Sequence, residues 1–147
     1  YIWSREITIF LMSYNRNGES IMKVNIPEII EEVTEAFMSY EKALTENDIE
    51  MINHLFWNDP KTLRYGPNGT LISHRALSAF RRDRVTDGVR RTLKNTSIVT
   101  FGHNFAIANT EASYEDASGT GRQSQTWVRT ADGWKIVSAH VSYLEDS

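Results

Sequence analysis

The 147-residue sequence contains no cysteine. This absence excludes disulfide bonds, thiolate metal sites and cysteine nucleophiles. It is also compatible with a reducing compartment, so we expect a cytoplasmic protein. Long apolar runs are absent too, because the longest one, Ile7 to Met12, is far shorter than the roughly 20 residues that cross a bilayer. We therefore expect no membrane segment and no membrane partner.

A large excess of basic residues is also missing. The formal net charge is −3, whereas nucleic-acid binding needs a concentrated surplus of Lys and Arg to contact phosphates. The sequence has no phosphate loop, no dinucleotide glycine fingerprint and no Gly-x-Ser-x-Gly elbow. No histidine pair has metal-ligand spacing together with a carboxylate. These absences argue against a nucleic-acid partner, a nucleotide or metal cofactor, and acyl-enzyme chemistry.

The sequence does contain enough apolar material for one globular domain. Hydrophobic residues make up 40% and charged residues 24% of the chain, close to the averages for soluble proteins, and the length suits one core. From Met22, MKVNIPEII is typical of an ordinary protein start that leads into a helix. We therefore predict one domain over residues 22–147 and interpret residues 1–21 as a leader, with an ordered β arm as the alternative.

Two helices are predicted before the first strand. Apolar residues recur at spacings of three and four from Pro27 to about Leu44, which indicates one buried face of a long helix. A second helix is expected over residues 48–56. Asn47 is its predicted N-cap, and Glu50, three residues later, completes a capping box.

A third, basic helix is predicted from a Ser73 cap to about Arg84. Its arginines form one locally basic stretch in an acidic protein. This stretch either attracts an anionic substrate to a pocket mouth or forms a solvated helix face paired with acidic neighbours. The side chains expected to face inward are Ala76, Leu77 and Phe80, and those expected on the remaining surface are Arg75, Arg81, Arg82 and Arg84.

The remaining pattern is that of β-strands. A short strand over 61–65 ends at the turn cluster 66–69, and turn signals separate four longer strands, so neighbouring strands should pair antiparallel. Helices segregated from such a meander indicate an α+β fold, in which a curved antiparallel sheet wraps around the N-terminal helices. The four longer strands are expected over residues 92–101, 105–114, 123–129 and 134–144.

Arg64 is the first candidate for ligand binding. It lies in the short predicted strand, where partial burial is expected, and a buried guanidinium needs an acceptor. Its planar fork suits a carboxylate. A ligand anion is one possible acceptor, and an internal ion pair with Glu35, Asp59 or Glu111 is the equally open alternative.

Two residues are candidates for proton transfer. Tyr40 lies on the apolar face of the long helix, so its hydroxyl should seek a partner near a cavity, unless it is simply a satisfied core tyrosine. His140, on the last strand, is either a general acid or base or an anchor between strands. Alternation places Trp134 and His140 on the same face of the last strand, but it leaves open which face of the last two strands points inward.

Three segments of the chain resemble a known family. They are LFWNDPKTLRYGPNGTLISHRALSAFRRDR, SIVTFGHNFAIANTEASYED and GTGRQSQTWVRTADGWKIVSAHVSYL. Together they resemble the AtzH-like family, within the SnoaL-like and nuclear-transport-factor-two-like group of cystatin-like cone folds, over about residues 26–144. The resemblance implies a homodimer and a role in oxalurate or ureido-acid catabolism. One characterised activity of that family decarboxylates dicarboxyurea to allophanate.

The resemblance also implies site residues and no cofactor. The matching tyrosine of the first helix is Tyr40 and the matching arginine of the RYG motif is Arg64, so these two are the expected catalytic pair. The sequence departs from the family pattern at 67–70 and at Ser73-His74, which leaves the loop shape and the substrate open. Other matching positions are expected to bind substrate, namely Tyr65, Arg81, Arg84, Gln123, Ser124 and His140.

The expected function is therefore that of a pocket protein for a small anionic carboxylate. The first hypothesis is a cofactor-independent decarboxylase of a dicarboxyurea-like anion. The alternative is a non-catalytic metabolite-binding module, or an accessory dimer that supports a partner amidohydrolase, since one fold hosts both classes. A polyketide-cyclase or ketosteroid-isomerase activity would need a wider apolar cavity and a carboxylate base, for which the sequence offers no strong candidate.

Overall fold

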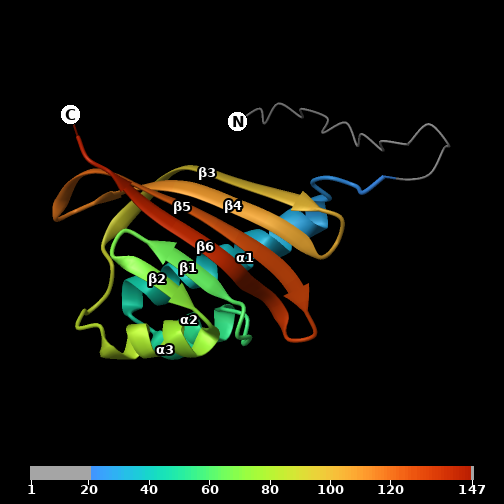
Figure 1. Cartoon of the computed structure of the whole chain (residues 1–147). Coiled ribbons are helices and arrows are strands. Elements are labelled where there is room, and N and C mark those ends of the chain that lie inside the picture. The colour runs from blue at the N-terminus through green and yellow to red at the C-terminus, as the bar shows by residue number, and fades with distance from the viewer. Residues whose placement is uncertain (1–20, 147) are drawn as a thin grey trace.

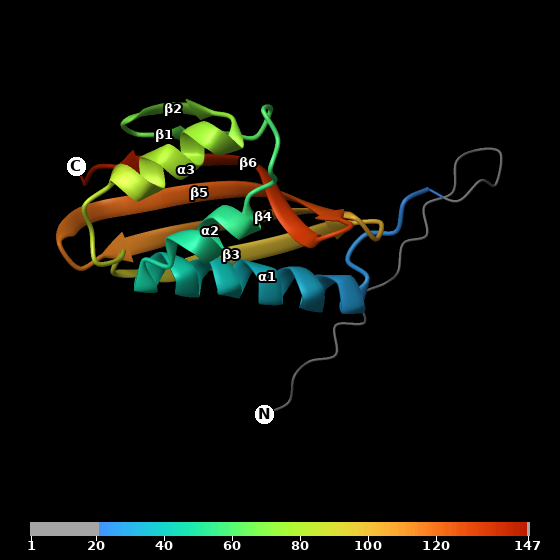
Figure 2. The same cartoon turned by 90° about the horizontal axis from the view of Figure 1, so that it is seen from below.

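Within residues 21–146, the three helices lie on one side of a strongly bent, six-stranded sheet (Figures 1 and 2). This computed structural model describes residues 21–146, so the predicted leader lies outside the described residues except for its last position. The α+β fold with a curved sheet is confirmed. In chain order the elements are α1 (Pro27–Glu46), α2 (Ile49–Leu55), β1 (Leu63–Gly66), β2 (Gly69–Ile72), α3 (His74–Asp83), β3 (Arg91–Phe101), β4 (Phe105–Tyr114), β5 (Ala117–Thr130) and β6 (Gly133–Leu144).

The long helix α1 forms where the apolar periodicity predicted it. Pro27 occupies the first turn, and the helix ends at Asn47, whose φ of 52° lies in the left-handed region. One face of α1 packs against the concave side of the sheet. This face is apolar except for two residues near the C-terminal end, and its buried members are Ile29, Val33, Phe37, Tyr40, Glu41, Ala43 and Leu44.

The capping box predicted for the second helix is wrong. Asp48 caps α2, and its carboxylate accepts a hydrogen bond from the Met51 backbone N–H at 3.0 Å. Asn47 instead ends α1, and its side-chain amide donates to the Thr86 carbonyl at 2.9 Å. Because only two residues separate the helices, the left-handed residue that terminates the first cannot also adopt the extended backbone of an N-cap.

The strand order is β2-β1-β6-β5-β4-β3. Strands β3 to β6 form the predicted antiparallel meander. Two features of the sheet were not predicted. Strand β1 pairs parallel with β6, with Arg64 opposite Ala139, and β2 completes a tight hairpin with β1. The short β2 begins at Gly69 inside the turn cluster, which hid its strand pattern.

Strand β5 begins six residues before its predicted start. Gly119 and Gly121 fall in the turn predicted between residues 114 and 123, but both lie within the strand. A Cβ atom at Gly119 would come within 2.7 Å of the Tyr143 hydroxyl, and one at Gly121 within 2.7 Å of the Tyr114 ring. These glycines therefore allow aromatic rings to lie directly on the strand.

A β-bulge in β6 decides which side chains face the helices. The register of β5 and β6 shifts so that Val137 has no partner residue. Trp134 and Ile136 before the bulge are buried, and Ala139 after it is buried as well. The strict alternation predicted for this strand, which placed His140 on the face of Trp134, is therefore wrong. His140 lies on the outer face, away from the helices.

The hydrophobic core fills the space between α1, α2, α3 and the concave face of the sheet. Trp127 and Phe37 are the largest side chains that are fully buried there. None of the helices formed by residues 21–146 is long and apolar enough to cross a membrane.

Candidate functional site

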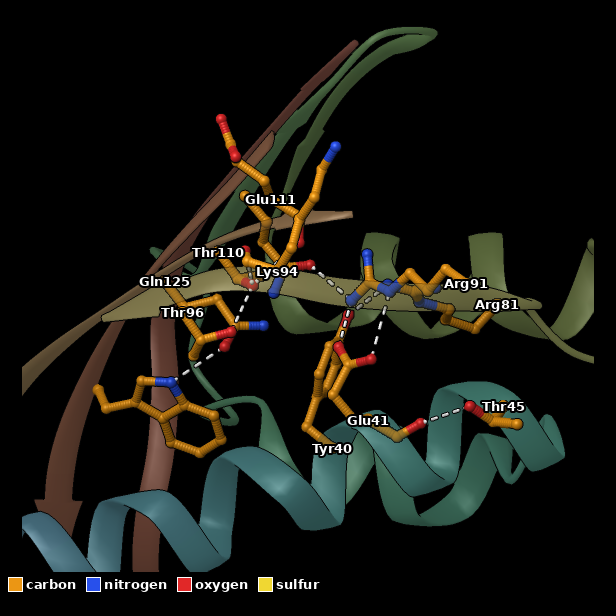
Figure 3. Close-up of polar contacts among 12 residues, drawn as sticks. Tyr40, Glu41, Thr45, Arg81, Arg91, Lys94, Thr96, Thr110, Glu111 and Gln125 are labelled. Carbon is orange, nitrogen blue, oxygen red and sulfur yellow. Dashed lines mark hydrogen bonds and ion pairs between the residues drawn. The ribbon is translucent and has the colours of Figure 1, made fainter. Parts of the chain in front are cut away.

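Tyr40 on α1 and Arg81 on α3 meet in the interior of the molecule. Both side chains are buried, and Nη2 of Arg81 donates a hydrogen bond to the Tyr40 hydroxyl at 3.4 Å. Figure 3 shows Tyr40 pointing away from α1 toward Arg81. The prediction that Arg81 lies on the surface of its helix is wrong. Because α3 packs against both α2 and the β1–β2 hairpin, more of its circumference is buried than its apolar residues indicate.

Three arginines surround the ring of Phe80. The central guanidinium carbons of Arg64, Arg81 and Arg84 lie 5.7, 5.8 and 5.9 Å from the ring centroid. At such distances the ring face attracts each cation. Within residues 21–146, no carboxylate forms an ion pair with any of the three. We call these three residues the arginine cluster.

The internal ion pair that was the alternative for Arg64 does not form among the described residues. Glu35 is exposed on α1. The Asp59 carboxylate accepts a hydrogen bond from the backbone N–H of Lys61, and the Glu111 carboxylate accepts one from a side-chain amide of β3. The acceptor that a partly buried guanidinium requires is therefore not supplied by these three acidic residues.

The arginine cluster is electrostatically unfavourable without a ligand. Burial, and secondarily the positive charge of Arg81, lowers the pKa of both Arg64 and Arg84. Nε of Arg81 and both Nε and Nη2 of Arg84 are buried without a hydrogen-bond partner in the described part of the chain. A bound anion would accept from these donors and offset the repulsion among the three cations.

Gly66 leaves the space that the Arg64 side chain occupies. The two residues share one face of β1. A Cβ atom at position 66 would lie only 2.6 Å from Nη1 of Arg64. The guanidinium therefore lies over the glycine, in the direction of Phe80.

A fourth arginine near the site is already neutralised. Arg91 donates from Nε to Glu41 Oε2 at 3.2 Å and from Nη2 to Oε1, and both side chains are almost fully buried. Burial alone would lower the pKa of Arg91, but the hydrogen bonds and charge of Glu41 outweigh it and raise that pKa. Glu41 was not predicted to be a site residue, although a glutamate within the apolar stripe of α1 indicates a buried charge that needs a partner.

The structure divides the eight predicted site residues between the two faces of the sheet. Five of them lie on the helix side: Tyr40, Arg64, Arg81, Arg84 and Gln123.

The other three form a separate group on the outer face. The rings of Tyr65 and His140 are in edge contact, with their centroids 5.7 Å apart. Ser124 is the cross-strand partner of His140. These three residues lie outside the candidate site, because the sheet itself separates them from Tyr40 and the arginine cluster.

Two cavities in the described part of the chain do not contain the arginine cluster. One of about 870 Å³ lies beside α2 and includes His54, Trp57 and Lys135. Another of about 520 Å³ lies on the outer face and includes Ser124 and His140. Arg64, Arg81 and Arg84 line neither of these two cavities.

The groups that the site offers to a ligand are cations and hydrogen-bond donors. Within residues 21–146, no three His, Asp or Glu side chains gather closely enough to hold a metal ion. The carboxylate next to Tyr40, that of Glu41, is occupied by Arg91. The arrangement suits an anionic ligand with several acceptor atoms.

Solved structures of similar proteins support this architecture. A protein of unknown function from Pectobacterium atrosepticum is 46% identical, with 83% of this chain and 95% of that chain covered and a TM-score of 0.81. A cystatin-like fold protein from Burkholderia xenovorans is 44% identical, with 86% and 99% covered and a TM-score of 0.81. A nuclear transport factor 2-like superfamily protein from Salmonella enterica is 26% identical, with 82% and 94% covered and a TM-score of 0.62. The comparison with curated proteins gives no match.

The family comparison agrees with the solved structures. The AtzH-like family model matches residues 22–147, which is nearly all of the chain after the predicted leader. The two structures above 40% identity share the curved-sheet architecture over most of their length. The chain therefore belongs to the AtzH-like family and has a cystatin-like, nuclear-transport-factor-two-like fold.

Proposed function

We propose that this protein binds a small carboxylate anion at Arg64, Arg81 and Arg84 and removes carbon dioxide from an N-carboxylated, dicarboxyurea-like substrate. The observation that carries the proposal is the arginine cluster: three guanidiniums with no carboxylate partner within the described residues. Buried donors without acceptors stand beside it. A dianionic ligand would supply the missing charge and the missing acceptors together.

Substrate binding would be the task of the arginine cluster. The fork of Arg64 holds one carboxylate in a bidentate manner. The N-carboxylate that is lost lies nearer to Tyr40, in a drier part of the interior, where it is poorly hydrated. Loss of hydration favours decarboxylation, because the negative charge leaves the carboxylate as neutral carbon dioxide forms.

Proton transfer would be the task of Tyr40. When the bond between nitrogen and the carboxylate carbon breaks, its electron pair stays on nitrogen and carbon dioxide departs. The Tyr40 hydroxyl gives its proton to that nitrogen. Arg81, which already donates a hydrogen bond to the hydroxyl oxygen at 3.4 Å, stabilises the phenolate until water restores the proton.

The competing hypothesis is a binding module or accessory dimer that uses the same cluster without catalysis. Both hypotheses require anion binding, and only the first requires turnover. The homodimer and the cytoplasmic location remain predictions from the sequence, and light scattering on the purified protein checks the first of them.

The test is a thermal-shift panel followed by an assay of carbon dioxide release. Dicarboxyurea, oxalurate and allophanate are each compared with monocarboxylates. The proposal expects the dianion to raise the melting temperature most and to release carbon dioxide, whereas binding without release would favour the module.

A pair of arginine variants connects that panel to the site. Arg64→Lys keeps the charge but loses the fork, so we expect affinity for the dianion to fall about tenfold. Arg75→Lys makes the same change at an exposed position of α3 and is the matched control. Equal affinities of the two variants would refute the role of Arg64.

A further inference from the structure

Two glutamines stand side by side on the inner face of β5. Gln123 and Gln125 are two residues apart, so both side chains point to the same face of the strand. Their exposed fractions are only 5% and 1%. Two carboxamides this deeply buried need partners for both of their polar ends.

The chemistry of their partners fixes the orientation of both amides. The indole N–H of Trp127 has only a proton to donate, and it meets Gln125 at 3.1 Å, so the group it meets must be the carbonyl oxygen. The Arg91 guanidinium is likewise a pure donor, and its Nη2 meets Gln123 Oε1 at 3.2 Å. In each glutamine the acceptor end is used, and the NH₂ group points elsewhere.

Neither NH₂ group has a partner among residues 21–146. Nε2 of Gln123 and Nε2 of Gln125 are both buried without a hydrogen bond. In Figure 3 the Gln125 amide nitrogen points to the side on which Tyr40 and Arg81 lie. A buried donor without an acceptor is destabilising, and two on one strand indicate an acceptor that the described chain does not provide.

The register of the sheet aligns these donors with the arginine cluster. Gln125 pairs with Ala139, and Ala139 pairs with Arg64, so the three residues form one row across β5, β6 and β1. Two strand spacings separate Gln125 from Arg64 by roughly 10 Å. The residue between them in this row is an alanine, so no longer side chain of the row stands between Gln125 and Arg64.

From this arrangement we infer that Gln123 and Gln125 form a subsite that donates hydrogen bonds to a neutral carbonyl oxygen of the ligand. The inference rests on the proposed anion site, since the same ligand places its carboxylate at the arginine cluster. The ligand class is thus a short ureido or carboxamido carboxylate, with an anionic group at one end and an uncharged carbonyl near the other. The Glu41–Arg91 ion pair acts as a positioning device, because it holds the Gln123 amide in its donating orientation.

The composition of the chain provides a direct test. Its whole sequence contains only two glutamines, the two in question. Labelling with glutamine carrying ¹⁵N in the side chain therefore gives two NH₂ signals in the full-length protein. The probes are oxalurate, with a carboxylate and neutral carbonyls, valerate, with a carboxylate only, and urea, with a carbonyl only.

The inference predicts that oxalurate and urea move both NH₂ signals downfield and that valerate leaves them in place. If urea moves the signals while oxalurate causes no thermal shift, the subsite stands and the proposed anion site fails. If oxalurate raises the melting temperature but the signals stay in place with oxalurate and urea, the subsite is refuted and anion binding stands.

A variant provides the second measurement. Gln125→Leu removes the amide while keeping a similar volume, and we expect the ratio of oxalurate to valerate affinity to fall about tenfold. Ser124→Ala, the neighbouring residue on the outer face, is the matched control and should leave this ratio within about twofold. An unchanged ratio in a folded Gln125→Leu protein would overturn the inference.

Discussion

The Arg81 guanidinium donates a hydrogen bond to the Tyr40 hydroxyl, 3.4 Å away, between two residues that are 41 positions apart in the chain. Both are buried, although one is charged and the other is polar at its tip. The contact joins the proposed proton donor on α1 to the arginine cluster on α3. Tyr40 can therefore be tested by a change that removes one oxygen atom and little else.

Tyr40→Phe should abolish most of the turnover without unfolding the protein. The variant keeps the ring in the core, so the melting temperature should change by only a few degrees, whereas loss of the proton donor should lower carbon dioxide release about 100-fold or more. Calorimetry and a coupled carbon dioxide assay measure the two effects. Turnover equal to that of the wild type would remove Tyr40 from the mechanism.

Gly66→Ala should move Arg64 while leaving the strand intact. The added methyl group would meet Nη1 of Arg64 at 2.6 Å, and a flexible guanidinium yields more easily than the backbone. Gly66 does not have a positive φ, so alanine fits its backbone conformation. We expect the affinity for a dicarboxylate to fall about fivefold, while the circular dichroism spectrum stays that of the wild type. An affinity equal to that of the wild type would show that Arg64 does not bind the anion.

Glu41→Gln should destabilise the protein strongly. It leaves the Arg91 guanidinium buried without its counter-charge, which typically costs about 3–5 kcal/mol. Glu46→Gln, at an exposed position of the same helix, is the control and should cost less than about 0.5 kcal/mol. Urea unfolding at neutral pH compares the two, and similar midpoints would contradict the importance of this ion pair.

Glu32 should contribute to stability in a pH-dependent manner. Hydrogen bonds from Trp134 Nε1 at 2.9 Å and from Arg129 at 2.6 Å lower the pKa of Glu32 below its ordinary value of 4.5. A carboxylate with a lowered folded-state pKa stabilises the fold above pH 4.5, and this contribution disappears as the pH falls through the folded-state value.

Glu32→Gln tests that dependence. Because the carboxylate is partly exposed, we expect a loss of only about 0.5–1 kcal/mol at pH 7. The difference from the wild type should shrink steadily below pH 4.5. Urea unfolding at several pH values gives the comparison, and a constant difference down to pH 3 would contradict the assignment.

Most of the fold was predictable because its elements are long and regularly patterned. The apolar stripe of α1 and the strands β3, β4 and β6 were predicted close to their observed positions, whereas β5 begins six residues before its predicted start. The parallel pairing of β1 with β6 was not predictable, since only tertiary contacts bring residues 63 and 138 together. The bulge at Val137 leaves no mark in the sequence pattern, yet it decides that His140 faces outward.

The candidate site was only partly predictable. Arg64 and Tyr40 could be selected because each is a polar residue in a segment expected to be buried. Arg81 was assigned to the surface because a single helix does not reveal that neighbours cover it on two sides. Gln125 was not selected as a site residue, since its significance depends on the direction of one amide, which Trp127 determines through space.

The parallel pairing of β1 with β6 has a consequence for biosynthesis. Arg64 is translated well before the strand beside it, Gly133–Leu144. A nascent chain that has not yet reached β6 therefore lacks the strand that holds β1 in the sheet, and we expect it not to retain an anion at Arg64. Truncation before residue 133 should abolish anion binding.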